Sequence, residues 1–269
     1  MRHSIAIVSL VLFVLSMALL LTLAKQAYIP RKEVRDLAKI YLNTTYNPWN
    51  KKFTAMSPEG VTAIVWDYRG LDTVFETAVF YLAIIGSIAL ARGIGKYSKP
   101  TSDEKKLGLS LIVKTVTRIT TVSIIAVAVS IALHGHLTPG GGFQGGATAA
   151  VAPLLILIAF SQYFLLERGV SKDLMLVIRS LGLAGIGLTA IAAYFIGVAM
   201  NKYAFVLQNQ AKPLSEVSIP AYIDGQLISG TLWFFNISEF FAVMAGFTIV
   251  LILLVIPERA FKSSGGEEK

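Results

Sequence analysis

The sequence contains no cysteine and very little charge. Without cysteine the chain can form no disulfide, hold no cysteine-ligated iron–sulfur cluster and perform no thiol chemistry. Only 15% of its 269 residues are charged and 55% are hydrophobic, a balance that is rare in a soluble domain of this length. The composition therefore indicates a membrane protein without cysteine-based redox chemistry.

Six apolar stretches are long enough to cross a bilayer, because about 20 helical residues span its hydrocarbon core. We predict an all-α, polytopic membrane protein with about six transmembrane helices. The stretch at 5–24 follows a basic start, so a signal peptide is the alternative to a retained helix. It is too long for a typical signal sequence and lacks a good cleavage site, which favours a retained helix. The six stretches are 5–24, 73–91, 109–133, 147–166, 174–200 and 237–256.

The net charge of +8 gives the expected orientation. Outside the long 25–72 segment, Lys and Arg concentrate at both termini and in the 92–106 and 167–173 loops, and basic loops favour the cytoplasmic side. We therefore expect a multi-pass protein of the cell membrane with both termini cytoplasmic and the 134–146 loop outside. A nucleic-acid partner is not expected, because the basic residues are explained by the membrane.

Two loop segments have features of their own. "PRKEVRDLAKIY", starting at Pro30, predicts a short amphipathic helix that lies on the membrane surface or on a partner. "YSKPTSDEKK", at 97–106, is polar and interrupted by proline, as in a linker between a two-helix front part and a four-helix rear part.

Acidic residues inside predicted spans are costly and are therefore functional candidates. Glu76 lies near the start of the second stretch. It is either stabilised there by the helix dipole or forms a proton or sodium site. Glu239 lies near the start of the sixth stretch, close to Asn236. Interfacial solvation and a buried partner are the two interpretations of Glu239.

Three basic residues also fall within the predicted spans. Lys114 and Arg118 share a helix face, being four residues apart. Lys114 is expected to extend its ammonium group to the interface, and so is Arg179 near the start of the fifth stretch. Arg118 lies deeper, and we expect it to pair with a carboxylate of a neighbouring helix or subunit.

The segment "HGHLTPGGGFQGG", at 134–146, separates two apolar stretches. Pro139 disfavours a continued helix, while Gly140, Gly141 and Gly142 permit a tight turn. Gly142 and Gly146 then begin a small-residue face that lets helices approach closely, a role in which we also include Gly145.

His134 and His136 have two interpretations. In a purely structural turn they cap carbonyl groups of the preceding helix. Alternatively they carry protons near a polar cavity, because histidine titrates near neutral pH. No zinc site is expected, since the chain has neither cysteine nor a second histidine-rich segment.

The segment "VKTVTRITTVSIIAVAVSIALHGHLTPGGGFQGGATAAVAPLLI" resembles the B subunit (MnhB) of Mrp-type multisubunit sodium/proton antiporters. The resemblance covers four helices and places an MnhB-like domain at 101–269. "WDYRGLDTVFETAVFYLAIIG" is similar to the C-terminal two-helix region of the antiporter A subunit, which places that region and its external 25–72 loop at 1–100. Leu71 and Phe75 depart from that second pattern, which remains readable.

A chain that joins both pieces resembles subunits of archaeal respiratory complexes, namely membrane-bound hydrogenases and sulfur-reducing relatives of complex I. The resemblance implies a non-catalytic subunit whose partners are other Mrp-like subunits, a complex I-related or hydrogenase-type redox module, and membrane lipids. No cofactor is expected in this chain, and Na⁺ and H⁺ are the ions expected to move.

The resemblance matches Glu76 to the motif glutamate and so implies that it lies on the cation path. Asp67, Arg69 and Asp72 would form the polar mouth leading to it. Arg118, His134, His136 and Glu239 complete the ion-path candidates. The alternatives are a purely structural subunit and, less well supported because no internal repeat is present, a self-contained transporter.

The expected topology can be tested with reporters whose activity depends on the side of the membrane. A reporter fused after Lys269 and another inserted in the 97–106 linker should both read cytoplasmic. An external C-terminus would overturn either the count of six spans or the charge argument.

Overall fold

The computed structural model describes residues 2–27, 34–50, 52–91 and 108–255. The 97–106 linker, Pro30 and the C-terminal tail lie outside the described residues. The chain divides into two units, 1–40 and 41–269.

The first unit contains α1 (Arg2–Ala27) and the start of α2 (Asp36–Thr45). The apolar side chains described in α1 are exposed; Leu10, for example, is 63% exposed. A helix that is hydrophobic on all sides is suited to contact with lipid or with other membrane helices. In α2 the predicted amphipathic helix begins at Asp36, whose carboxylate pairs with Lys39 across 3.2 Å.

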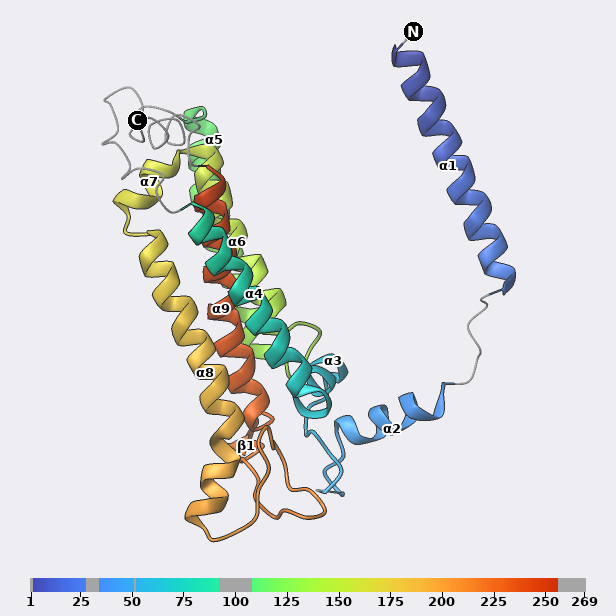
Figure 1. Cartoon of the computed structure of the whole chain (residues 1–269), viewed down its shortest axis with the longest axis vertical. Helices are drawn as coiled ribbons and strands as arrows, with labels where there is room; N and C mark the ends of the chain where they lie inside the picture. Colours follow the sequence, from blue (N-terminus) through green and yellow to red (C-terminus); the bar gives the residue numbers. More distant parts are fainter. Residues whose placement is uncertain (1, 28–33, 51, 92–107, 256–269) are drawn as a thin grey trace, which may run out of the picture. The chain divides into compact units, whose positions relative to one another are not determined.

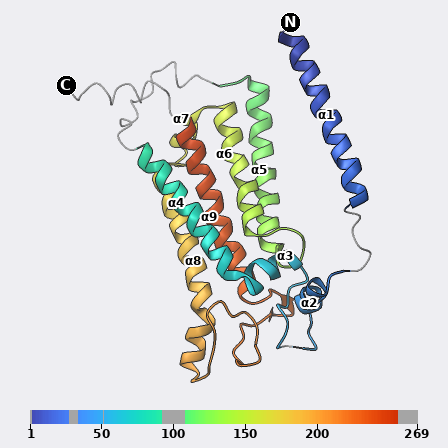
Figure 2. The ribbon, with the colours of Figure 1, turned by 45° about the vertical axis from the view of Figure 1, so that its right-hand side comes forward.

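The second unit is built around the last helix, α9 (Thr231–Leu254). It packs against α4 (Gly70–Leu90), α5 (Leu111–His134), α6 (Gly142–Ala159) and α8 (Lys172–Ala199). Figure 2 shows α9 between α4 and α8 on one side and α5 and α6 on the other. Among the described residues, six helices including α1 are long and apolar enough to cross a membrane, so the predicted all-α fold with six spans is confirmed.

Glycines allow α9 to approach its neighbours closely. A Cβ atom on Gly146 of α6 would lie 2.7 Å from the carbonyl oxygen of Phe240 and 2.8 Å from Cβ of Val243. On α8, a Cβ atom on Gly182 would lie 2.6 Å from the carbonyl oxygen of Ser238. Backbone-to-backbone contact of this kind stabilises helix pairs in membranes, where apolar burial contributes little.

Two predicted boundaries were wrong. The fourth stretch was placed at 147–166, but α6 starts at Gly142 and ends at Ala159, and a separate short helix, α7 (Gln162–Glu167), follows. The sixth was placed at 237–256, but α9 starts at Thr231. The start of α6 was missed because it is rich in glycine, and the start of α9 because Asn236 interrupts the apolar run.

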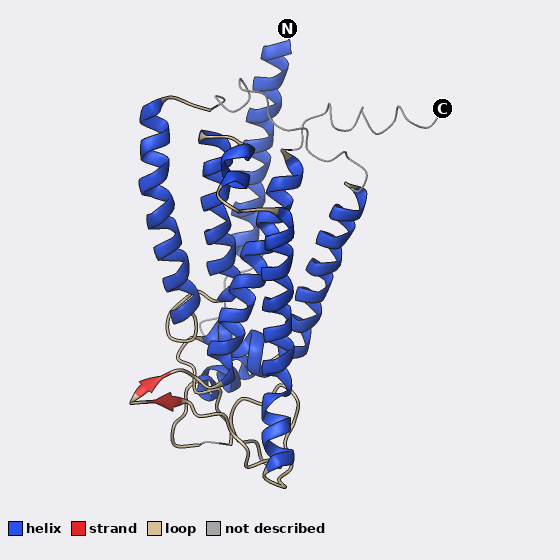
Figure 3. Cartoon of the chain, turned by 90° about the vertical axis from the view of Figure 1, so that its left-hand side faces the viewer, coloured by secondary structure: helices blue, strands red, loops and turns tan. Residues whose placement is uncertain are grey.

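One end of the second unit carries a layer of loops, formed by residues 46–50, 52–59, 135–141 and 200–230. We call it the loop layer. It contains a two-stranded hairpin, β1 (Tyr222–Ile223) and β2 (Gln226–Leu227), in which Tyr222 lies opposite Leu227 (Figure 3). Asp224 and Gly225 make the turn with positive φ angles of 48° and 75°, as an Asp-Gly hairpin requires.

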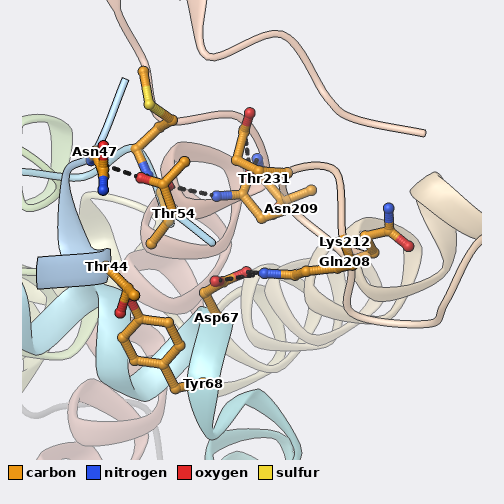
Figure 4. Close-up of polar contacts among 12 residues, drawn as sticks. Thr44, Asn47, Thr54, Asp67, Tyr68, Gln208, Asn209, Lys212 and Thr231 are labelled. Atoms are coloured by element: carbon orange, nitrogen blue, oxygen red, sulfur yellow. Dashed lines mark hydrogen bonds and ion pairs between the residues drawn. The ribbon is translucent and has the colours of Figure 1, made fainter. Parts of the chain in front are cut away.

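Buried amide and hydroxyl groups connect the segments of the loop layer. The side chain of Asn209 donates to the carbonyl oxygen of Ala55 at 2.8 Å and accepts from the backbone N–H of Thr231 at 2.9 Å. Thr54, close to it in Figure 4, accepts from the backbone N–H of Asn47 at 2.9 Å. Hydrogen bonds therefore hold the segments of the loop layer to one another and to the start of α9.

Between the loop layer and α4 the chain makes α3 (Gly60–Thr62) and a π-helical turn, η1 (Ala63–Tyr68). The ring of Trp66 in this turn is 1% exposed and stacks on Phe235 of α9 with 4.3 Å between centroids. π-helical turns occur frequently at functional sites. Although the resemblance divides the chain near residue 100, α4 packs on α9 within the same compact unit as α5 to α9.

Gly146→Leu should impair assembly, because the added side chain would overlap backbone atoms of α9 at a cost on the order of 1–3 kcal/mol in a packed site. The control is Gly187→Leu on α8, where a Cβ atom would meet nothing within 4 Å. Recovery of the intact complex from detergent-solubilised membranes measures the difference. A fully assembled, active Gly146→Leu complex would defeat the packing account.

Candidate functional site

Glu76 lies on an exposed face of α4, about two turns from the start of the helix. It shares a groove of about 700 Å³ with Arg69, Asp72, Phe75 and Val79. Acyl chains solvate an ionisable group poorly. Glu76 therefore requires water or a polar protein surface against this face of α4.

Arg69 and Asp72 lie at one end of the same groove. The Nε atom of Arg69 donates to Asp72 at 2.7 Å, and both side chains are more than half exposed. Such an exposed pair contributes little to stability. It places one positive and one negative group beside the groove that contains Glu76.

Asp67 lies apart from this pair, in the π-helical turn. Its side chain is fully buried and bonds to the ammonium group of Lys212 in the loop layer at 2.9 and 3.2 Å (Figure 4). Burial raises the pKa of the Asp67 carboxyl group above its ordinary value of 3.8, and the charge of Lys212 opposes that rise. Asp67, Lys212, Arg69 and Asp72 line a second cleft of about 470 Å³.

The structure places four of the predicted residues, Asp67, Arg69, Asp72 and Glu76, along two adjoining clefts. Arg69 and Asp72 line both clefts, so they join the Asp67–Lys212 pair to the groove of Glu76. Lys212 was not recognised in the sequence, because it lies far from Asp67 along the chain and in a loop without a motif.

Glu239 is buried on α9 and is only 6% exposed, so interfacial solvation is the wrong interpretation. It seemed to lie at a helix start because α9 was predicted to begin six residues too late. Its carboxyl group lies at the N-terminus of α6. An added Cβ atom on Gly142 would be 2.7 Å from Oε2 of Glu239. Only glycine at position 142 leaves room for this carboxyl group.

No side chain of the adjacent loop caps α6, and residues of α9 take over that role. The backbone N–H of Gly142 donates to Oδ1 of Asn236 at 3.4 Å, and the backbone N–H of Phe143 interacts with the Glu239 carboxyl group. The first amides of a helix need such acceptors, and a carboxylate there also benefits from the helix dipole. Glu76 is close enough to interact electrostatically with Glu239.

The two histidines have different surroundings. His134 ends α5 and its Nδ1 atom lies 3.0 Å from the carbonyl oxygen of Ser130, so it contacts the preceding helix as expected for a cap. His136 does not: its side chain is buried, and Nε2 lies 2.8 Å from the carbonyl oxygen of Leu227 in the hairpin. The ring of His136 reaches the hairpin because the backbone beside it is held in place. The hydroxyl groups of Ser57 and Thr62 donate to the backbone carbonyl groups of His136 and Gly135.

Lys114 and Arg118 lie toward the end of the second unit that carries α7. Both cations lie over the ring of Phe160, at 5.8 and 5.3 Å from its centroid. Arg118 also lines a pocket of about 220 Å³ with Glu167, and its pairing with a carboxylate of a neighbouring helix or subunit stays a prediction. Phe160 can serve both because it follows α6 where that helix stops, a break that the predicted boundary concealed.

Arg179 does not extend to the interface as expected, because its side chain is fully buried. Nη1 donates to the carbonyl oxygen of Ala242 on α9 at 2.7 Å, and the guanidinium group lies 4.4 Å from the centroid of Phe80 on α4. Its Nε and Nη2 atoms have no hydrogen-bond partner in the described part of the chain. No local signal could have revealed this position, since its contacts come from two distant helices.

The described residues therefore form a helical membrane protein with carboxyl groups on and inside its span. They hold no group of three or more His, Asp or Glu side chains that could bind a metal ion together. Carboxyl groups in this setting can bind and release protons or monovalent cations.

Residues 112–249, just over half of the chain, match the family described as "Domain related to MnhB subunit of Na+/H+ antiporter", and the chain belongs to this family. It is 31% identical over 232 residues to the uncharacterised protein MJ1307 of Methanocaldococcus jannaschii, covering 79% of this chain and 83% of that protein.

Two solved complexes contain similar chains. One chain of the membrane-bound sulfane sulfur reductase, an archaeal respiratory membrane complex, matches with a TM-score of 0.56 and 28% identity over 91% of this chain and 96% of its own. A chain of the Mrp complex from Dietzia sp. matches with a TM-score of 0.55 and 18% identity over 97% of this chain and 26% of its own, which shows a shared fold. The chain is a multi-pass membrane subunit of the kind found in Mrp-type antiporters and related respiratory complexes.

The buried histidine gives a pH prediction. Burial lowers the pKa of His136 below its ordinary value of 6.5, so the folded state prefers the neutral ring. Its contribution to stability is complete above pH 6.5 and declines as the pH falls below that value, because the unfolded state then binds more protons. Acid should therefore lower the protection of the hairpin amides relative to their intrinsic exchange rate at each pH, measured by mass spectrometry of the intact complex.

His136→Gln should leave assembly intact and reduce this acid effect, because glutamine keeps a donor for the Leu227 carbonyl but does not titrate. His134→Gln is the matched control, since its contact lies within α5. An unchanged acid effect in His136→Gln would assign the effect to another group. Loss of ion exchange in that variant would instead place His136 on a proton path.

Proposed function

We propose that this chain is a membrane-arm subunit of an Mrp-like Na⁺/H⁺ antiporter module in an archaeal respiratory complex of the hydrogenase or sulfur reductase type. In that complex it takes part in cation and proton translocation. The likeness to the sulfane sulfur reductase chain over nearly all of its length supports the setting. Residues 1–100 would supply the part that resembles the antiporter A subunit, and residues 101–269 the B-subunit part.

The observation that carries the proposal is the position of Glu76. An exposed carboxyl group on a spanning helix is costly in lipid, so the groove that contains Glu76 is a candidate for ion binding. The neighbouring groove residues leave space for water or for the side chains of another subunit. Other Mrp-like subunits are the partners proposed to cover it, and a complex I-related or hydrogenase-type module the partner proposed to supply redox energy.

The path begins at the loop layer. The cleft at the Asp67–Lys212 pair and the groove of Glu76 share Arg69 and Asp72, so an ion could pass from one to the other along polar groups. The paired charges of Arg69 and Asp72 would lower the cost of bringing a cation to Glu76 without binding it tightly. Na⁺ and H⁺ are the transported ions, and the chain itself contributes no redox cofactor.

A second candidate function is that of a purely structural subunit. The close contacts of Gly146 and Gly182 with α9 favour it, since they make a rigid helical block that can hold other subunits in place. In that case changes at Glu76 would alter the yield of the complex but not ion movement per complex.

Glu76→Gln tests the proposal because it keeps the size of the side chain and removes the negative charge. We expect Na⁺-dependent proton movement in membrane vesicles to fall to background while the complex still assembles. The control is Glu216→Gln, whose side chain is 81% exposed in the loop layer. Normal exchange per assembled complex in Glu76→Gln would refute the proposal.

A further inference from the structure

The polar groups around Glu239 are mostly hydrogen-bond donors. The backbone N–H of Phe143 interacts with its carboxyl group, and the indole N–H of Trp66 lies near that group without making a hydrogen bond. The indole N–H of Trp66 and the side-chain amide nitrogen of Asn236 are buried and lack a hydrogen-bond partner among the described residues. A carboxyl group one turn from Asn236 on α9 therefore lies among donors that need an acceptor.

We infer that Glu239 is a proton-binding group of the subunit that excludes Na⁺, so that it serves the proton and not the sodium branch of exchange. The inference rests on the proposed function and assigns an ion to a group within it. Three features support it: the donors around the carboxyl group, the oxygen atoms near it, and its nearest titratable neighbour.

The donors favour a bare carboxylate over a carboxylate that binds a metal cation. N–H groups stabilise the negative charge when the proton leaves. They cannot ligate Na⁺, a hard cation that takes oxygen ligands, as other hard cations do. The N-terminus of α6 carries a partial positive charge, so it repels a metal cation placed at this point.

The side-chain oxygen of Asn236, one turn from Glu239, is already engaged. Oδ1 of Asn236 accepts the backbone N–H of Gly142 at 3.4 Å. A sodium site would need several free oxygen atoms around one point, whereas Glu76 is the one carboxyl group among the described residues that interacts with Glu239. A proton needs no such shell.

The space around the carboxyl group is equally restricted. Because even a Cβ atom on Gly142 would lie 2.6 Å from Cβ of Glu239 and 2.7 Å from its Oε2, the carboxyl group is pressed against the helix end. Room for a coordinated ion is not available on that side.

The charged groups of the surrounding helices are few. Among the described residues α6 contributes no acidic or basic side chain. Asp72 and Glu76 lie on α4, and of these Glu76 interacts with Glu239. On α8, Arg179 bonds to α9 at Ala242, while Lys172 and Asp173 pair with each other in the first turn. The π-helical turn contributes Asp67, which is paired with Lys212. The α5 cations Lys114 and Arg118 lie over Phe160, and His134 bonds within α5. Glu76 is therefore the partner for proton exchange.

The proton transfer is balanced without any other reactant. The O–H bond of protonated Glu239 breaks, the proton passes to the Glu76 carboxylate through intervening water, and Glu239 is left as a carboxylate. The reverse transfer restores it. No electron moves, so the step needs no redox cofactor.

Infrared difference spectroscopy of the purified, intact complex tests the inference without requiring turnover. A pH step should produce a carbonyl band of a protonated carboxyl group that is absent in Glu239→Gln and present in Glu216→Gln. Replacing choline by Na⁺ at constant pH should leave this band unchanged. Because the band reports protonation and not transport, its outcome is separate from that of the Glu76→Gln exchange assay.

Two results would overturn the inference. A band that persists in Glu239→Gln would belong to another carboxyl group, and a Glu239 band that Na⁺ removes would make this a sodium site. If Glu239→Gln does not assemble, Glu239→Asp keeps an acidic group on the same helix. That variant should shift the band, and an unshifted band would equally exclude Glu239 as its source.

Discussion

The close approach of α6 to α9 is the contact on which the rest of the second unit depends. Position 142 has no side chain, so the first turn of α6 lies directly against Asn236 and Glu239. Each helix supplies what the other lacks: α6 has amides without a local cap, and α9 has buried polar groups in an apolar span. Because both needs are met at one point, the two helices are fixed in rotation and in height, and the remaining helices pack around that fixed pair.

The acidic groups occupy two different environments around this pair. Glu76 and its neighbours on α4 lie on an exposed face, where a partner or water can reach them, whereas Glu239 is enclosed. The Asp67–Lys212 pair ties the loop layer to the turn that precedes α4. In such an ion path this chain would supply some of the polar groups and neighbouring subunits would supply the others. This division is consistent with a family related to one subunit of a Na+/H+ antiporter.

The membrane fold was predictable because it depends on length and apolarity, which are local properties of the sequence. The helix starts of α6 and α9 were not, since "GFQGG" and "TLWFFN" become helical only when a neighbouring helix satisfies and covers them. The burial of Arg179 likewise depends on Phe80 and Ala242, far away along the chain. Unlike these features, the hairpin has a local signal that the sequence analysis did not use. In "YIDGQL" an Asp-Gly turn stands between strand residues.

The cap of α6 also has a consequence for biogenesis. The acceptors for its first amides belong to Asn236 and Glu239, which are synthesised almost a hundred residues after Gly142. During insertion α6 must therefore enter the bilayer with exposed N–H groups and remain incompletely satisfied until α9 follows it. α9 thus completes the polar bonding of an earlier helix, so the amides at the start of α6 gain these acceptors only after α9 has been synthesised.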